Sequence, residues 1–186
     1  YAPIFFKQAK YTLLDQNTFW LCEKPDSVGM VGWDAALTRI ATWAKLQDKK
    51  TGQILMVVNT HFDHIGTEAR RNSALLIIEK IKEIVGTSPA ILTGDFNVSE
   101  DWDAYKTITN NEFILKDAHK VAGKRTGVDF TYHNFGKIPA EKCEKIDFIF
   151  VTPQIRVISS YIPFSQLNDT LFLSDHNPEI VELEIK

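Results

Sequence analysis

Along much of the chain, hydrophobic and polar residues alternate with a period of two, which predicts β-strands with one buried face. The alternation is clearest over Glu179–Lys186, where Val181, Leu183 and Ile185 are expected to point inward and the glutamates between them outward. Short apolar runs bounded by turn residues predict the other strands. These are expected over Tyr11–Leu14, Thr18–Cys22, Arg39–Gln47, Gln53–Phe62, Pro89–Thr93, Asp129–Phe135, Lys145–Thr152 and Gln154–Tyr161.

The period changes to that of an amphipathic helix over Glu68–Val85, and Gly86 is expected to end this helix. A second helix is expected over Trp102–Ile108, with Ser99 or Asp101 as its N-terminal cap. The buried face of the first helix is predicted to consist of Ala74, Ile77, Ile78, Ile81, Ile84 and Val85.

Clusters of turn-forming residues separate these elements. Asp15-Gln16-Asn17 is expected to form a turn between the first two strands, and residues 48–52 the turn of a hairpin whose second strand ends at His61. The chain contains no internal repeat, linker or low-complexity stretch. We therefore expect one α/β domain over residues 1–186 that is rich in antiparallel strands.

Composition narrows the possible functions only a little. A chain of 186 residues can bury about 70% of its unfolded surface in one core. Its net charge of −3 provides no basic surface for nucleic acid, which weakens a nuclease interpretation without excluding it, because metal ions can supply positive charge. No apolar run approaches the ~20 residues of a transmembrane helix. Two cysteines, Cys22 and Cys143, are too few to define a disulfide framework.

Polar side chains with catalytic potential occur where predicted strands end. Asp95 and Asn97 follow an apolar strand and a glycine, and their spacing can direct both side chains to one face. The carboxylate can bind a hard cation, and the amide beside it can donate a hydrogen bond to a phosphate oxygen. The alternative is an ordinary turn, because glycine, aspartate and asparagine all favour turns.

Asp147 lies within an otherwise apolar strand, where an unpaired carboxylate would be costly. A histidine is a natural partner because the carboxylate fixes its tautomer, although an arginine, a lysine or a strand-edge position would also explain Asp147. Asp175 and His176 precede the final strand. Neighbouring residues on an extended backbone point apart, so these two are expected to have separate roles unless they are simple loop residues.

The other polar candidates have simpler expected roles. His61 ends a strand and could be a core or edge residue, while Asp63 and His64 are expected to decorate the loop after it. Arg70 and Arg71 open the first helix, where surface ion pairs are expected although either could reach a phosphate. His119 is expected to be solvated, and His133 could line a cleft.

Four segments occur in a fixed order: Asn59-Thr60-His61, Gly94-Asp95-Phe96-Asn97, Ile146-Asp147-Phe148 and Ser174-Asp175-His176-Asn177-Pro178. Their order resembles the endonuclease/exonuclease/phosphatase superfamily, and residues 23–33, 39–43 and 68–70 look most like its bacterial, often exported, branch. The resemblance implies a DNase I-like α/β fold, a four-layer sandwich of two mainly antiparallel β-sheets flanked by helices.

The resemblance also implies a metal centre that uses Mg²⁺ or Mn²⁺. Asp175 would bind the metal, and Asn97 would hold the phosphate and serve as a further candidate metal ligand. Asp95 would position the attacking water or bind a second metal.

The remaining implied roles concern the two histidines. His61 would stabilise charge on the phosphoryl oxygens. Asp147 would orient His176, which would contact the phosphate or assist proton transfer.

One part of the family pattern is not visible in the sequence. The family normally begins with a strand carrying an asparagine, followed by a glutamate that binds the same metal as Asp175, and neither motif precedes His61. The chain begins at Tyr1 without an initiating methionine, so we expect a fragment or processed form of an exported bacterial protein. Weak metal binding and low activity are then expected unless another chain supplies the missing segment.

The expected function is metal-dependent hydrolysis of a phosphodiester or phosphomonoester by activated water. The acidic balance favours a phosphorylated small molecule, a sugar phosphate or a lipid head group over nucleic acid. A membrane-binding sphingomyelinase would need an exposed apolar hairpin, which the sequence does not predict. A nuclease and a non-catalytic phosphate-binding domain remain the alternatives.

Overall fold

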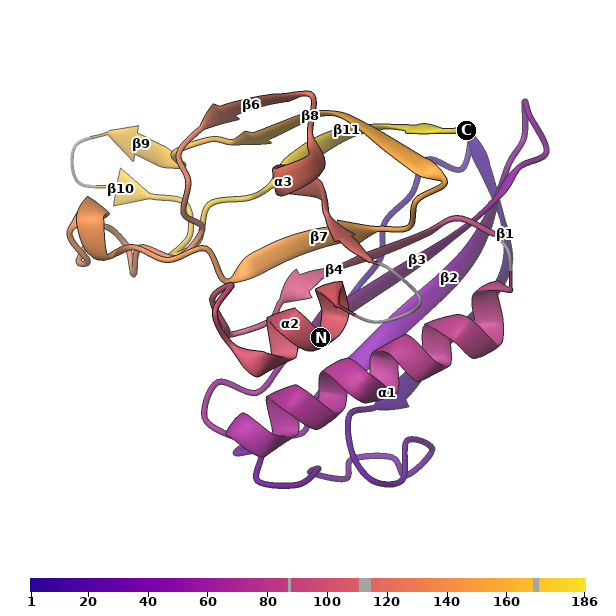
Figure 1. Ribbon diagram of the computed structural model, residues 1–186, viewed down its shortest axis with the longest axis horizontal. Helices are drawn as coiled ribbons and strands as arrows, with labels where there is room; N and C mark the ends of the chain where they lie inside the picture. Colours follow the sequence, from indigo (N-terminus) through magenta and orange to yellow (C-terminus); the bar gives the residue numbers. More distant parts are fainter. Residues whose placement is uncertain (87, 111–114, 169–170) are drawn as a thin grey trace.

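The computed structural model describes residues 1–86, 88–110, 115–168 and 171–186 and consists of two facing β-sheets with helices mainly on one side (Figure 1). The larger sheet has six strands. In spatial order they are β1 (Tyr11–Trp20), β2 (Ile40–Asp48), β3 (Ile54–His61), β4 (Ala90–Asp95), β7 (Asp147–Val151) and β5 (Lys116–Asp117).

The predicted hairpin is confirmed, because β2 and β3 pair antiparallel and are joined by a tight turn. The Asp48 Oδ1 accepts hydrogen bonds from the backbone N–H groups of Lys50 and Thr51 at 2.8 and 2.9 Å. The predicted turn at residues 15–17 is wrong. β1 runs through this segment with a register shift between Leu13 and Asp15, since pairing with β2 outweighs the turn preference of the side chains.

Helix α1 (Thr67–Val85) connects β3 to the parallel strand β4 and covers one face of the larger sheet (Figure 1). Its predicted apolar face is confirmed, and Gly86 ends it with a φ of +58°. Helix α2 (Asp103–Thr109) packs against α1. The predicted side-chain cap of α2 is wrong, because Trp102 occupies that position and the Ser99 hydroxyl instead bonds the Asp101 carboxylate at 3.0 Å.

The smaller sheet contains β6 (Lys124–Gly127), β8 (Ile155–Ile162) and β11 (Ile180–Ile185), with β8 in the centre. The alternation predicted for β11 is confirmed. Apolar side chains of both sheets pack together between them, including Leu55, Val151 and Val157. The remaining elements are α3 (Ala118–Val121), the short 3₁₀ helix η1 (Ala140–Lys142), and the paired strands β9 (Gln166–Asn168) and β10 (Leu171–Phe172).

The strand predicted over Asp129–Phe135 is wrong. The strand of this region is β6, and the following segment forms only an isolated bridge at Tyr132 before a turn. Thr131 and His133 are fully buried here, because the segment folds into the space between the sheets' ends. The Thr131 Oγ1 accepts hydrogen bonds from the backbone N–H groups of Ile146 and Asp147 at 3.0 and 3.1 Å.

The expected α/β class with two main sheets is therefore confirmed, and the two longer helices lie on the six-stranded sheet (Figure 1). None of the helices in the described part of the chain is long and apolar enough to cross a membrane.

Candidate active site

Three of the predicted site residues lie in one row across the larger sheet. His61 is paired with Asp95 in the β3–β4 register, and Asp95 is paired with Asp147 in the β4–β7 register. Residues that are directly opposite on neighbouring strands point to the same face of a sheet. The sheet register therefore brings together side chains that are up to 86 positions apart in sequence, counting from 61 to 147.

The close approach of β3 and β4 at this row depends on Gly94. A Cβ atom built on Gly94 would lie 2.3 Å from the backbone oxygen of Thr60, which no side chain could tolerate. Glycine therefore allows the strands to carry His61 and Asp95 side by side.

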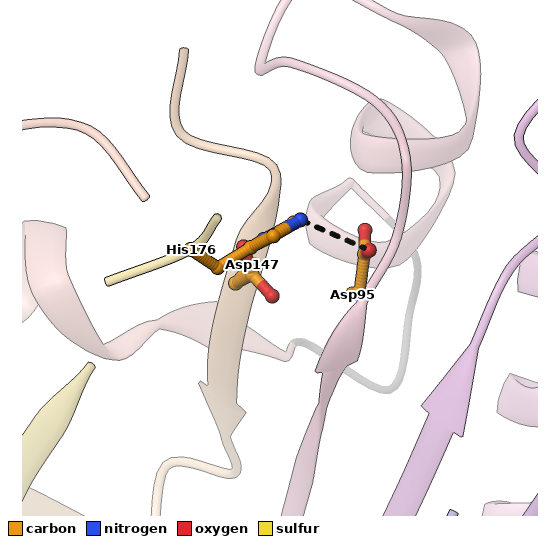
Figure 2. A group of neighbouring side chains, drawn as sticks. All are labelled: Asp95, Asp147 and His176. Atoms are coloured by element: carbon orange, nitrogen blue, oxygen red, sulfur yellow. Dashed lines mark hydrogen bonds and ion pairs between the residues drawn. The ribbon is translucent and has the colours of Figure 1, made fainter. Parts of the chain in front are cut away.

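His176 completes the cluster from the segment before β11. Its Nδ1 lies 2.7 Å from Asp147 Oδ2, and its Nε2 lies 4.0 Å from Asp95 Oδ2 (Figure 2). On the other side, His61 Nε2 lies 3.4 Å from the same Asp95 oxygen. The Asp95 carboxylate thus lies between two imidazoles.

The surroundings shift the pKa values of these groups in different directions. Burial and the nearby charge of Asp147 raise the pKa of Asp95 to about 6. Burial and the positive charge of Arg39 lower the pKa of His61 to about 4. Burial also lowers the pKa of His176, but the hydrogen bond and charge of Asp147, with smaller effects of Asp95 and Asp175, outweigh it and raise that pKa overall.

The donor set of the cluster fits a divalent cation. Asp95, Asp147 and His176 each offer one ligand atom, and these atoms all lie within 4.8 Å of one another. Among the residues that the structure describes, the ion-pair partners of both carboxylates are histidines, with no lysine or arginine. Two neighbouring carboxylates without a permanent cation suit Mg²⁺ or Mn²⁺.

The two other predicted metal ligands lie differently. Asn97, with a φ of +50°, donates from its backbone N–H to Asp95 Oδ1 at 2.9 Å and from its amide to the Phe62 oxygen at 3.0 Å. Its side chain is thereby fixed beside Asp95. Asp175 does not belong to the group of three potential ligands, although its charge acts on His176, so its role as a metal ligand stays a prediction.

Arg39 is a charged residue of the site that the sequence analysis missed. Its Nε lies 3.5 Å from Asp63 Oδ2, and its Nη2 lies 3.2 Å from His64 Nδ1. Its charge lowers the pKa values of both His61 and Asp95. The only sequence signal was its position at the start of a strand that pairs with the strand ending in His61.

Asp63 was predicted to be a loop residue without a structural role, and this is wrong. Its side chain is only 1% exposed and accepts hydrogen bonds from the backbone N–H groups of Leu37, Ile65 and Gly66. Asp63 therefore shapes the loop after β3 and holds Arg39 near the site. His64 is exposed as expected.

Three further expectations are corrected by burial. Arg70 makes no surface ion pair but is buried, donates to the Asp63 backbone oxygen at 3.0 Å, and packs over Trp102. His119 is buried rather than solvated, and its Nδ1 lies 2.8 Å from Ser160 Oγ. His133 is buried between the rings of Phe164 and Phe172, and its Nδ1 accepts a hydrogen bond from the Gly136 N–H at 3.0 Å.

A cavity of about 410 Å³ adjoins the cluster and is lined by Asp95, Asp147, His61, Asn59 and Glu179 among others. This volume is within the usual range for small-molecule sites. Exposed apolar side chains occur near β9 and β10, at Phe164, Leu167, Leu171 and Leu173. The expectation that the chain lacks the apolar hairpin of a membrane-binding sphingomyelinase stays a prediction.

Comparison with known proteins agrees with this geometry. The sequence profile of the Endonuclease/Exonuclease/phosphatase family matches residues 5–176. The crystal structure of an endonuclease/exonuclease/phosphatase from Bacteroides vulgatus is 64% identical, with a TM-score of 0.93, over 97% of this chain and 69% of that chain. The structure of the mannosyl-6-phosphatase of Bacteroides thetaiotaomicron is 34% identical, with a TM-score of 0.88, over 97% and 69% of the two chains.

A curated relative is an uncharacterised protein of Acanthamoeba polyphaga mimivirus. It is 30% identical over 175 residues, which are 89% of this chain, and this chain spans 63% of the relative's length. The profile and the Bacteroides structures confirm the family expected from the four segments, including its bacterial branch. The chain belongs to the endonuclease/exonuclease/phosphatase family.

Proposed function

We propose that the protein is a metal-dependent phosphoric ester hydrolase. The observation that carries this proposal is the position of the Asp95 carboxylate between His61 and His176, beside a second carboxylate and without a permanent cation among its ion-pair partners. Such a site combines ligands for a divalent cation with groups that can orient and deprotonate water.

The proposed metal ligands are Asp95 and Asp147, with Asp175 and Asn97 as further candidates. A bound Mg²⁺ or Mn²⁺ would neutralise phosphate charge and lower the pKa of a coordinated water. The fit rests on oxygen-rich donors that face one another at the edge of the sheet.

Residues of the chain supply the proton transfer, hydrogen bonding and charge stabilisation that the reaction also needs. The Asp95 carboxylate, which lies between His61 and His176, accepts a proton from the attacking water. His176 presents Nε2 to a phosphoryl oxygen while Asp147 holds its Nδ1. His61, neutral at pH 7, contributes a neutral hydrogen bond, and the charge of Arg39 stabilises the developing negative charge.

A phosphorylated small molecule is the proposed substrate class, with a sugar phosphate monoester as the first candidate. Three observations support it: a cavity of about 410 Å³ beside Asp95, a net charge of −3, and likeness to a structure named as a mannosyl-6-phosphatase. A net charge of −3 disfavours a long nucleic acid, because its binding depends on many contacts between basic side chains and phosphates.

Phosphate release from mannose 6-phosphate, p-nitrophenyl phosphate, bis-p-nitrophenyl phosphate and a single-stranded oligonucleotide tests this proposal. Each is assayed with Mg²⁺, Mn²⁺ or EDTA. We expect metal-dependent turnover that favours the monoesters. Preference for the oligonucleotide, with a steep loss of binding as salt is added, would indicate a nuclease instead.

A further inference from the structure

The Asp147–His176 hydrogen bond joins the start of β7 to the segment before β11. A second charged contact joins the same two segments. Lys145 precedes Asp147 by two residues, and Glu179 follows His176 by three. Lys145 Nζ lies 2.9 Å from Glu179 Oε2, and the two side chains are only 6% and 3% exposed. The Lys145–Glu179 ion pair and the Asp147–His176 hydrogen bond therefore both connect the start of β7 with the segment that leads into β11.

Both members of the pair are also anchored elsewhere. Lys145 Nζ donates a hydrogen bond to the backbone oxygen of Asp147 at 2.9 Å and lies over the Phe148 ring. Glu179 Oε1 lies 3.2 Å from the hydroxyl of Ser160 in the smaller sheet. The ion pair thus connects the backbone of Asp147 in one sheet with the central strand of the other.

Stability alone explains this contact poorly. A buried ion pair must overcome the desolvation of both charges, and well-packed apolar residues often replace such a pair without loss of stability. Burial in fact raises the pKa of Glu179 despite the charge of Lys145. An ion pair with hydrogen bonds is directional and can fix the relative position of the two segments. An apolar contact has no preferred direction and would not do so.

We propose that Lys145 and Glu179 are positioning residues that hold Asp147 and His176 in hydrogen-bonding register. The proposal rests on the proposed function for its consequences in catalysis. Loss of the pair is expected to lower kcat about 10- to 100-fold, as is typical when a residue that orients a catalytic histidine or carboxylate is removed.

The test is the double substitution K145M/E179L, which removes both charges together. The Ser160 hydroxyl keeps its contact with His119 Nδ1 at 2.8 Å, whereas the Asp147 backbone oxygen loses the Lys145 donor. We expect a free energy of unfolding equal to or above that of the wild type and a kcat that falls by a larger factor than KM changes, because Glu179 also lines the cavity beside Asp95. The single substitution E179Q keeps one acceptor oxygen for Lys145 and an amide N–H that can donate to the Ser160 oxygen, and it is expected to retain most of kcat. The matched control is R156M/E184L, because Arg156 and Glu184 form an exposed pair at 3.2 Å between β8 and β11.

A second readout does not depend on turnover. The Nδ1 proton of His176, hydrogen-bonded to Asp147, is expected as a downfield proton resonance in the wild type and in the control. In K145M/E179L this resonance should broaden or disappear while the protein remains folded. If the wild type hydrolyses no substrate, the proposed function fails, but this resonance still tests the positioning role.

Two results would overturn the positioning role. One is a double variant whose resonance and kcat equal those of the wild type. The other is a double variant that unfolds, because the pair would then contribute stability rather than position.

Discussion

At the scale of single residues, the pKa values of the two imidazoles beside Asp95 are shifted in opposite directions. Partial burial of the ring and the positive charge of Arg39 disfavour the protonated form of His61 and lower its pKa to about 4. His176 has the carboxylate of Asp147 on Nδ1, which favours the protonated form. An imidazole that is neutral at pH 7 and one that protonates more readily therefore face one carboxylate.

An NMR titration of the histidine ring protons checks this difference. Without divalent cation, His61 should titrate with a midpoint near pH 4 and His176 above its ordinary 6.5. Added Mg²⁺ should lower the midpoint of His176, because a nearby cation disfavours the imidazolium. Assignment follows from His61→Asn and His176→Asn. Equal midpoints for both histidines, unaffected by Mg²⁺, would contradict the proposed electrostatics.

Arg39 offers a separate test of the same electrostatics. Arg39→Gln should raise the pKa of His61 towards its ordinary value and raise that of Asp95 further, because the positive charge lowers both. If the charge also attracts phosphate, KM should rise about 10-fold, as when one ionic contact worth about 1.4 kcal/mol is lost. The exposed Arg71→Gln is the control, and an unchanged His61 midpoint in Arg39→Gln would exclude the electrostatic role.

At the scale of elements, the loop between β3 and α1 depends on Asp63. Backbone hydrogen bonds from Gly66, Ile65, Ala36 and Leu37 outweigh the effect of burial and hold the pKa of Asp63 well below its usual range. A carboxyl group whose pKa is lowered by folding stabilises the fold above its unfolded pKa, near 3.9. That stabilisation is lost as the pH falls through the folded pKa.

Asp63→Asn should therefore lower the free energy of unfolding at pH 7 by about 2 kcal/mol, since hydrogen bonds to a charged acceptor are lost. The difference from the wild type should shrink as the pH falls below about 4. Urea unfolding at several pH values measures both, with the exposed Asp26→Asn as control. A deficit that does not change with pH would show that the charge of Asp63 is not the stabilising feature.

Elements that form because of a residue pattern within their own segment could be predicted from the sequence. Elements that depend on contacts with distant segments could not. The helical period over α1 and the alternation over β11 arise from the burial of one face, and both predictions are confirmed. The turn predicted at residues 15–17 failed because β2 pairs with the whole of β1. The strand predicted over residues 129–135 failed because Thr131 is buried to bond the backbone of Asp147, a contact between segments.

At the scale of the whole molecule, the order of four motifs predicted the family and the main residues of the candidate site. Sequence could not provide the strand register that aligns His61, Asp95 and Asp147. Nor could it reveal Arg39 or the buried pair of Lys145 and Glu179, because these depend on contacts between distant segments.

The central claim is that a divalent cation and Asp95 together hydrolyse a phosphate ester. Its most direct test is the rate of p-nitrophenyl phosphate hydrolysis as Mn²⁺ is titrated, for the wild type and for Asp95→Asn. We predict a rate that rises with Mn²⁺, is abolished by EDTA, and falls at least about 100-fold in Asp95→Asn while the variant stays folded. Turnover that persists in EDTA, turnover by Asp95→Asn near the wild-type rate, or no turnover by the wild type at any Mn²⁺ concentration would contradict the account.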